Sequence, residues 1–247
     1  MAFGEHIAQQ AEHERVSTLS TVEWNGCQVV NASSGDTISW LMDSLDAGNK
    51  RRLCFTSAHP LSLARHDPYL ATALRGMDAL LPDGSGVAAV KHETGHRLWV
   101  NLNPRDLVPA ILQALPVGTR FFQLGARRAI TKQVALNLSA TWPHLKLVGC
   151  QDSAFQPWDS AQVVQKVNRA RASVVLVGME TPRQELWMER YASQLEAELV
   201  LGVGSLFDFA ANHLFERRCP TDSLRTKGTW QLRVGGPTVV GSPPLSA

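Results

Sequence analysis

Short, continuous apolar runs alternate with helix-like segments through most of this chain, and this alternation restricts the folds available to it. Runs such as VVLVG (174–178) and LVLGV (199–203) contain only apolar residues and glycine, whereas the segments between them have the spacing of amphipathic helices. Strands that are apolar on both faces belong to parallel sheets covered by helices on both sides. The sequence therefore predicts an α/β fold with a Rossmann-like parallel sheet flanked by helices.

A weaker version of the same pattern occupies the first half. We expect a strand followed by a turn in RRLCFTSAHP (51–60), a strand and loop in DALLPDGSG (78–86), and a helix over 61–77 that the turn-prone sequence His-Asp-Pro interrupts. Asn103 and Pro104 predict the start of another helix, with the asparagine as N-cap and the proline in the first helical position.

Glycines stand at or just after the carboxyl ends of the expected strands. Open parallel sheets bind their ligands outside those ends, so the glycines predict which edge of the sheet holds the site. These glycines are Gly84, Gly125, Gly178, Gly202 and Gly204.

The length of 247 residues accommodates one large α/β domain. We expect a flexible leader at 1–20, the α/β domain at 21–218 and a short C-terminal appendage at 219–247. The end of the chain is rich in Gly, Pro and Ser after a basic stretch. Such a composition is typical of a flexible segment, and the basic stretch could contact a nucleotide or a membrane.

Charge and cysteine usage narrow the classes of partner. The formal net charge of +2 is too small to indicate nucleic acid, and we expect no such partner. The four cysteines have no C-x-x-C spacing, which fits a reducing compartment. The N-terminus lacks signal-peptide features, and no apolar run approaches the roughly 18 residues that span a bilayer. We therefore expect a cytoplasmic protein that could still contact a membrane.

The sequence HETGH (92–96) matches the H-E-x-x-H pattern of zinc proteases. That pattern needs both histidines on one helix, and Gly95 would weaken such a helix by about 1 kcal/mol relative to alanine. No later histidine or glutamate stands in a helix suited to a third ligand. We favour a polar helix end that enters a loop and keep a zinc hydrolase as a remote alternative.

Signals for phosphate binding are incomplete. DGSGVA and GVGSLF contain only parts of the G-x-G-x-x-G fingerprint, so a dehydrogenase is weakly supported. The best helix start for an anion is GMETPRQELW (178–187). There we expect Thr181 as N-cap and Gln184 as the third helical residue of a capping box, with Arg183 adding a mobile charge. Gln184 could equally do no more than close the cap.

Several of these segments occur together and resemble the WecG/TagA/CpsF family of bacterial glycosyltransferases. The most specific are PDGSG (82–86), G-x-x-x-P-R-Q-E (178–185) and GVGSLFDF (202–209), and the resemblance covers roughly residues 22 to 220. It implies an inverting, metal-independent transfer of a hexose, of the N-acetylmannosamine or glucose type, from a UDP-sugar to a polyprenyl-diphosphate-linked saccharide in cell-surface polysaccharide biosynthesis. It implies no cofactor, and the sequence contains no D-x-D triplet.

The resemblance also implies roles for individual residues. Asp83 matches the family's proposed catalytic base, Thr56 a threonine of the first pocket loop, and Gln184 the glutamine of the P-x-Q-E helix start. Gly204 and Asp208 match the glycine-rich strand end and the helix that follows. The other predicted substrate-binding residues are Gly84, Gly86, Gly125, Gly178, Arg183, Arg217 and Arg218.

The chain departs from the family pattern at several positions. Ala58 stands where the family usually has an asparagine, and Asn101 stands where it usually has an arginine, for which Arg97 or Arg105 could substitute. The C-terminal segment lacks the expected basic helix. These departures support an alternative, a degenerate member that binds UDP or the acceptor without turnover.

Inverting transfer needs a base for the attacking hydroxyl. Asp83 follows an apolar strand, where partial desolvation would raise its pKa towards a useful value. Without a metal, helix-start N–H groups and arginines would meet the charge on the leaving UDP, and Arg183, Arg217 and Arg218 are the candidates. The alternative for Asp83 is a turn aspartate that only bonds its own loop.

The resemblance places the expected partners at a membrane. They are the UDP-sugar donor, a lipid-linked saccharide acceptor and the cytoplasmic membrane surface. The protein would be peripheral to the inner face of the membrane. Assembly into a homo-oligomer is a further possibility.

Overall fold

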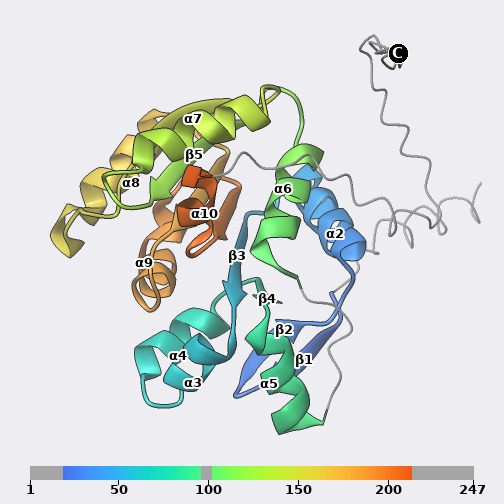
Figure 1. The fold of residues 1–247 in the computed structure, drawn as a ribbon. Coiled ribbons are helices and arrows are strands. Elements are labelled where there is room, and N and C mark those ends of the chain that lie inside the picture. The colour runs from blue at the N-terminus through green and yellow to red at the C-terminus, as the bar shows by residue number, and fades with distance from the viewer. Residues whose placement is uncertain (1–18, 96–101, 213–247) are drawn as a thin grey trace, which may run out of the picture.

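A single eight-stranded sheet organises the described part of the chain (Figure 1). The computed structural model describes residues 19–95 and 102–212. The strand order is β1-β2-β4-β3-β8-β7-β5-β6, and all neighbouring strands are parallel except β1 and β2. The predicted α/β class, a parallel sheet flanked by helices, is therefore confirmed.

The elements follow one another with mostly short connections. The strands are β1 (Thr21–Trp24), β2 (Cys27–Val30), β3 (Arg51–Thr56), β4 (Ala79–Pro82), β5 (Arg120–Gly125), β6 (Lys146–Gln151), β7 (Val174–Gly178) and β8 (Leu199–Gly202). The α-helices are α2 (Ser34–Asp46), α3 (Ala58–Leu63), α4 (Pro68–Arg75), α5 (Ser85–Thr94), α6 (Pro104–Ala114), α7 (Thr131–Thr141), α8 (Ser160–Arg169), α9 (Arg183–Tyr191) and α10 (Leu206–Asn212). Two 3-10 turns are η1 (Pro157–Asp159) and η2 (Ala192–Gln194).

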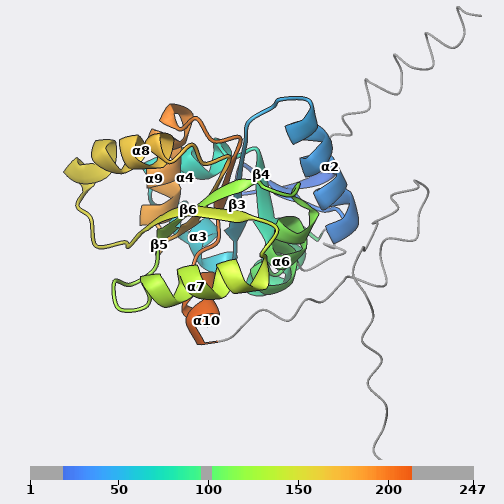
Figure 2. The same cartoon turned by 90° about the horizontal axis from the view of Figure 1, so that it is seen from above.

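Helices cover both faces of the sheet. One hydrophobic cluster joins α2, α6, α7 and α10 to the sheet and includes Phe207, whereas the other joins α3, α4, α8 and α9 and includes Trp187. Figure 2 shows α8 and α9 on one side of β5 and β6, with α7 and α10 on the other. Phe121 and Phe122 are neighbours on β5, and each is buried in a different cluster because successive side chains point to opposite faces. Burial on both faces explains why the strands are continuously apolar in sequence.

An antiparallel hairpin that we did not predict begins the sheet. Asn25 and Gly26 connect β1 to β2 with φ angles of +51° and +75°. Two residues with positive φ form the hairpin turn that matches the natural twist of the strands, and Asn-Gly is its strongest sequence signal. The signal was therefore present in the sequence.

The expected start of α6 is confirmed. The Asn103 Oδ1 atom accepts a hydrogen bond from the Arg105 N–H at 2.8 Å, as its predicted N-cap role requires. Asp67 caps α4 in the same way, and Pro68 occupies the first helical position. The predicted helix over 61–77 is thus two helices, separated at the His-Asp-Pro sequence. A cap of this kind stabilises a helix by about 1 kcal/mol.

Parts of the predicted organisation lie outside the described residues. These include most of the leader and all of the appendage at 219–247, so the boundaries at residues 20 and 218 stay predictions. Within the described ranges, no helix combines the length and apolar character needed to cross a bilayer.

Candidate active site

The carboxyl ends of the parallel strands bring most of the predicted site residues to one edge of the sheet. The arrow of β3 points toward this edge in Figure 1. The helix after β3 (α3) and the helix after β8 (α10) pack on opposite faces of the sheet. The chain connections therefore diverge between β3 and β8, and such a divergence is where open α/β sheets bind ligands.

Thr56 and Asp83 lie side by side at this edge. Thr56 ends β3, and its carbonyl oxygen accepts a hydrogen bond from the Asp83 N–H at 2.9 Å. Asp83 is half-buried. Burial raises the pKa of its carboxyl, and the positive charge of Arg105 lowers it in part, so the predicted effect of desolvation has the right direction. The Thr56 hydroxyl is buried without a hydrogen-bond partner among the described residues, which leaves its bonding capacity unused.

Gly84 and Gly86 follow Asp83, where the chain turns into α5. Gly84 is the N-cap of α5, with φ +44° and ψ −104°, a conformation that residues with a side chain rarely adopt. A Cβ atom on Gly84 would meet no heavy atom within 4 Å. Position 84 therefore requires glycine because of its backbone conformation and not because neighbouring atoms crowd it. Gly86 lies in the first turn of α5.

The helix needed for a zinc motif does not continue through HETGH. Helix α5 ends at Thr94, and Gly95 closes it in the left-handed conformation with φ +71°. His96 lies outside the described residues. Among the residues that are described, no three His, Cys, Asp or Glu side chains gather where they could hold a metal ion. The structure favours our interpretation of a polar helix end that enters a loop.

Gly125 and Gly178 permit close packing of the ends of β5 and β7. A Cβ atom on Gly125 would lie 2.0 Å from the Gly178 carbonyl oxygen, and one on Gly178 would lie 2.2 Å from the Phe207 ring. Both glycines are at the predicted edge. These close contacts are enough to explain why both positions are glycine. A contact between either glycine and a substrate stays a prediction.

The predicted capping box at α9 is wrong. Helix α9 begins at Arg183, one residue later than expected, and Pro182 occupies the N-cap position without a side-chain cap bond. Thr181 lies one residue before the N-cap, and its hydroxyl donates to the Glu185 Oε1 atom at 3.0 Å. The box does not form because Pro182, which has no side-chain acceptor, stands at the N-cap, and because the Gln184 Oε1 atom accepts from the N–H groups of Met179 and Gly204.

Gln184 points into the protein and bridges two strand ends. Its side chain is only 2% exposed, and its Oε1 atom accepts hydrogen bonds from the N–H groups of Met179 at 3.4 Å and Gly204 at 2.9 Å. Met179 follows β7 and Gly204 follows β8. Gln184 therefore fixes the loop that carries Gly204. This placement favours a positioning role for Gln184 over direct contact with a substrate.

Glu185 is a buried acid that our sequence analysis did not single out. It is 1% exposed, and its Oε1 atom lies 3.7 Å from the Cys54 Sγ atom. Burial raises the pKa of Glu185. The sequence signal for it was an acidic residue directly after Gln184 in a helix whose neighbouring positions face the core.

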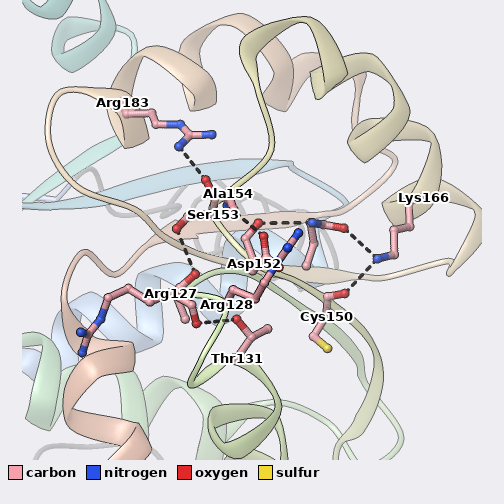
Figure 3. Close-up of polar contacts among 11 residues, drawn as sticks. Arg127, Arg128, Thr131, Cys150, Asp152, Ser153, Ala154, Lys166 and Arg183 are labelled. Carbon is pink, nitrogen blue, oxygen red and sulfur yellow. Dashed lines mark hydrogen bonds and ion pairs between the residues drawn. The ribbon is translucent and has the colours of Figure 1, made fainter.

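Arg183 is anchored and not mobile, contrary to our expectation. Its guanidinium donates to the carbonyl oxygens of Ser153, at 2.6 Å, and Phe155, and it lies over the Phe155 ring. Figure 3 shows Arg183 pointing at the loop after β6. That loop is also tied to the loop after β5, because the Ser153 hydroxyl donates to the Ala126 carbonyl oxygen at 2.9 Å. Arg183 thus locks neighbouring loops together.

Two further arginines, which we did not predict, follow β5. Arg127 forms an exposed ion pair with Asp208 at 3.0 Å. Arg128 pairs with Asp152 at 3.1 Å, and Figure 3 labels both residues. The predicted residue Asp208 is therefore at the expected edge but engaged with a cation. The other predicted residues here, Arg217 and Arg218, lie outside the described residues.

Arg105, at the start of α6, is near enough to Asp83 for its positive charge to lower the pKa of the carboxyl. The Leu102 N–H donates to the Pro82 carbonyl oxygen at 2.9 Å, which ties this start to the end of β4. The Arg105 guanidinium lies over the ring of Phe209 on α10, 4.7 Å from the ring centre. Of the two arginines proposed to substitute at position 101, Arg105 is thus near the predicted base. Asn101 and Arg97 are outside the described residues.

Comparisons with known proteins identify a family for this sequence. Residues 22–235 match the sequence profile of the glycosyl transferase WecG/TagA/CpsF family. The N-acetylglucosaminyldiphosphoundecaprenol N-acetyl-beta-D-mannosaminyltransferase of Bacillus subtilis (strain 168) is 27% identical over 162 residues, which cover 65% of this chain and 62% of that protein. The protein with the same name from Bacillus spizizenii is 24% identical over 172 residues, which cover 69% of this chain and 65% of that protein. The chain thus spans just under two-thirds of the length of both relatives.

Proposed function

The chain belongs to the glycosyl transferase WecG/TagA/CpsF family, and we propose that it transfers a hexose from a UDP-sugar to a polyprenyl-diphosphate-linked saccharide. The transfer would invert the anomeric carbon and would use no metal. Asp83 is the general base in this proposal. The observation that carries it is half-buried Asp83, whose backbone N–H donates to the carbonyl oxygen of Thr56, a residue with an unsatisfied hydroxyl, at the edge where parallel sheets bind ligands.

The proposed reaction is a single displacement. An acceptor hydroxyl oxygen forms a bond to the anomeric carbon while the bond from that carbon to the diphosphate oxygen breaks. The hydroxyl proton passes to Asp83, and the electron pair of the broken bond leaves with UDP. A base whose pKa is raised by partial burial is better matched to this task than a fully solvated aspartate, and a positioned base contributes roughly 10²–10⁴ in rate.

The proposed substrates follow the names of the two relatives. Those names describe transfer of N-acetylmannosamine to N-acetylglucosaminyl-diphosphoundecaprenol. We propose an acceptor of the same class, a saccharide on a polyprenyl diphosphate, and a UDP-linked hexose of the N-acetylmannosamine or glucose type as donor. Such an acceptor is held in a membrane, so the protein would work in the cytoplasm, peripheral to the inner membrane face, in the synthesis of a cell-surface polysaccharide.

A second candidate is binding of UDP or acceptor without turnover. It is supported by Ala58, which begins α3 two residues after Thr56 and has no side-chain amide. Where the family usually has asparagine, this chain cannot offer a side-chain hydrogen bond from that position. Turnover therefore has to be measured and not assumed from binding.

The test is UDP release from a panel of UDP-sugars in the presence of EDTA and a polyprenyl-diphosphate-linked acceptor. We expect release by the full chain and a loss of about 10²–10⁴-fold in Asp83→Asn, because the amide cannot take the proton. Asp43→Asn is the matched control, since Asp43 is an exposed carboxylate on α2, away from the site.

Each outcome has a separate meaning. Near-full release by Asp83→Asn would reject Asp83 as the base. No release from any donor by the unaltered chain, together with measurable UDP binding, would favour the binding-only candidate. Release that EDTA abolishes would reject the metal-independent mechanism.

A further inference from the structure

Four described arginines lie near the carboxyl edge of the sheet, and three of them are engaged within the protein. Arg127 and Arg128 each pair with a carboxylate, and Arg183 donates to two backbone carbonyls. The guanidinium of the fourth, Arg105, has no hydrogen-bond acceptor and no ion-pair partner among the residues that the structure describes. Arg105 therefore has the unused N–H donors at this edge of the described structure.

The backbone holds Arg105 close to the predicted base. The hydrogen bond from Leu102 to Pro82 fixes the start of α6 against the last residue of β4, directly before Asp83. Asn103 then caps α6 through the Arg105 N–H itself. The Arg105 charge is near enough to act on the Asp83 carboxyl. A ligand that contacts the Asp83 carboxyl would therefore also lie within reach of the Arg105 charge.

The Phe209 ring restrains the guanidinium without using its donors. The Arg105 Cζ atom lies 4.7 Å from the ring centre, a distance typical of a cation–π contact. Such a contact occupies the flat face of the guanidinium, whereas its N–H groups point outward in the plane. Phe209 belongs to α10, which follows the Gly204 loop, so the contact joins the two sides of the site.

We propose that the Arg105 guanidinium binds the diphosphate of the UDP-sugar and stabilises the charge on the departing UDP, an assignment that rests on the proposed transferase function. A guanidinium presents parallel N–H donors that match phosphate oxygens, and it keeps its charge at any working pH. When the sugar–oxygen bond breaks, its electron pair passes to the terminal phosphate oxygen of UDP. The interaction with Arg105 strengthens at that moment, which is the condition for lowering the barrier.

The test compares ligands with and without phosphates. Calorimetry on the full chain would measure the affinities of UDP and uridine for the unaltered protein, Arg105→Gln, Arg105→Lys and the control Arg169→Gln. Arg169 is exposed in the last turn of α8, at the opposite edge of the sheet. We expect Arg105→Gln to lose about tenfold or more in UDP affinity with uridine unchanged, and Arg105→Lys to recover part of the loss. Arg169→Gln should bind both ligands normally.

Other results would overturn the assignment. Equal UDP affinity in the unaltered protein and Arg105→Gln would reject the diphosphate contact, whether or not the protein transfers sugar. Parallel loss of UDP and uridine affinity would also reject it, because the substitution would then have disturbed the pocket and not a phosphate contact. If the phosphate-specific loss is found in a protein that releases no UDP from any donor, the contact is supported while the transferase function fails.

Discussion

At the scale of single residues, the Asp83 carboxyl links structure to pH dependence. A base must be deprotonated to work, and burial raises the pKa of Asp83 above its ordinary value. We therefore expect kcat/KM to rise with pH through a pKa above the usual aspartate value of about 3.9. Arg105 lowers this pKa, so the acidic limb of Arg105→Gln should lie at higher pH than that of the unaltered protein. Profiles of the two proteins with the same acidic limb would contradict this coupling.

Glu185 makes the stability of the fold depend on pH at the same scale. Burial raises its pKa, so the folded state holds a proton that the unfolded state has already lost once pH exceeds the ordinary glutamate range. Its contribution is therefore complete at low pH and is lost as pH rises through the raised pKa. Glu185→Gln has no proton to lose. We expect the free energy of unfolding of Glu185→Gln, minus that of the unaltered protein, to increase as pH rises. This difference should level off above the raised pKa of Glu185.

Urea unfolding of both proteins measures the difference, in which the titration of groups that do not contact Glu185 cancels. The pH range stops below the ordinary thiol pKa, because Glu185 also acts on the Cys54 thiol. A difference that does not change with pH would mean that Glu185 ionises in the folded state as it does in the unfolded chain.

At the scale of elements, the close approach of strand ends to α10 sets a packing limit. Gly178 does not have a left-handed φ, so the cost of Gly178→Ala comes from the methyl group, which would lie 2.2 Å from the Phe207 ring. We expect a loss of about 1–3 kcal/mol in the free energy of unfolding, measured by denaturant titration. Gly76→Ala is the control: its methyl would meet mainly the flexible carboxylate of Glu189, which can move, so a change within about 0.5 kcal/mol is expected. Equal stability of the two variants would show that α10 shifts freely.

The strands and helices were largely predictable because their sequence signals are local. Strands buried on both faces appear as unbroken apolar runs, and the break between α3 and α4 is marked by Asp67 and Pro68. The β1–β2 hairpin was also encoded locally, by Asn25 and Gly26, but we did not use that signal.

The candidate site was predictable only where neighbouring strands impose proximity. Thr56 and Asp83 are adjacent because β3 pairs with β4. The orientation of Arg183 depends instead on carbonyl groups of the β6–α8 loop, about 30 residues earlier in the chain. The environment of Gln184 likewise depends on strand ends that meet only in the folded sheet. Sequence reasoning identified these residues but could not tell which of them face a ligand and which hold the loops.

At the scale of the whole molecule, the site combines two halves of the sheet. Thr56 and Asp83 belong to the half formed by β1 to β4, whereas Gly178 and Gln184 belong to the half formed by β5 to β7 with its helices. β8 lies between these halves and pairs with both β3 and β7. The position of Gly204 just after β8 places it where both halves meet.

This central position of β8 also has a consequence for the order of folding. A ribosome releases the chain from its N-terminal end, so β3 and β7 emerge before the strand that lies between them. Until β8 arrives, each of the two has an open hydrogen-bonding edge, and open edges are templates for pairing with other chains. The nascent protein is therefore expected to carry its greatest aggregation hazard late in synthesis, and insertion of β8 both removes that hazard and completes the candidate site.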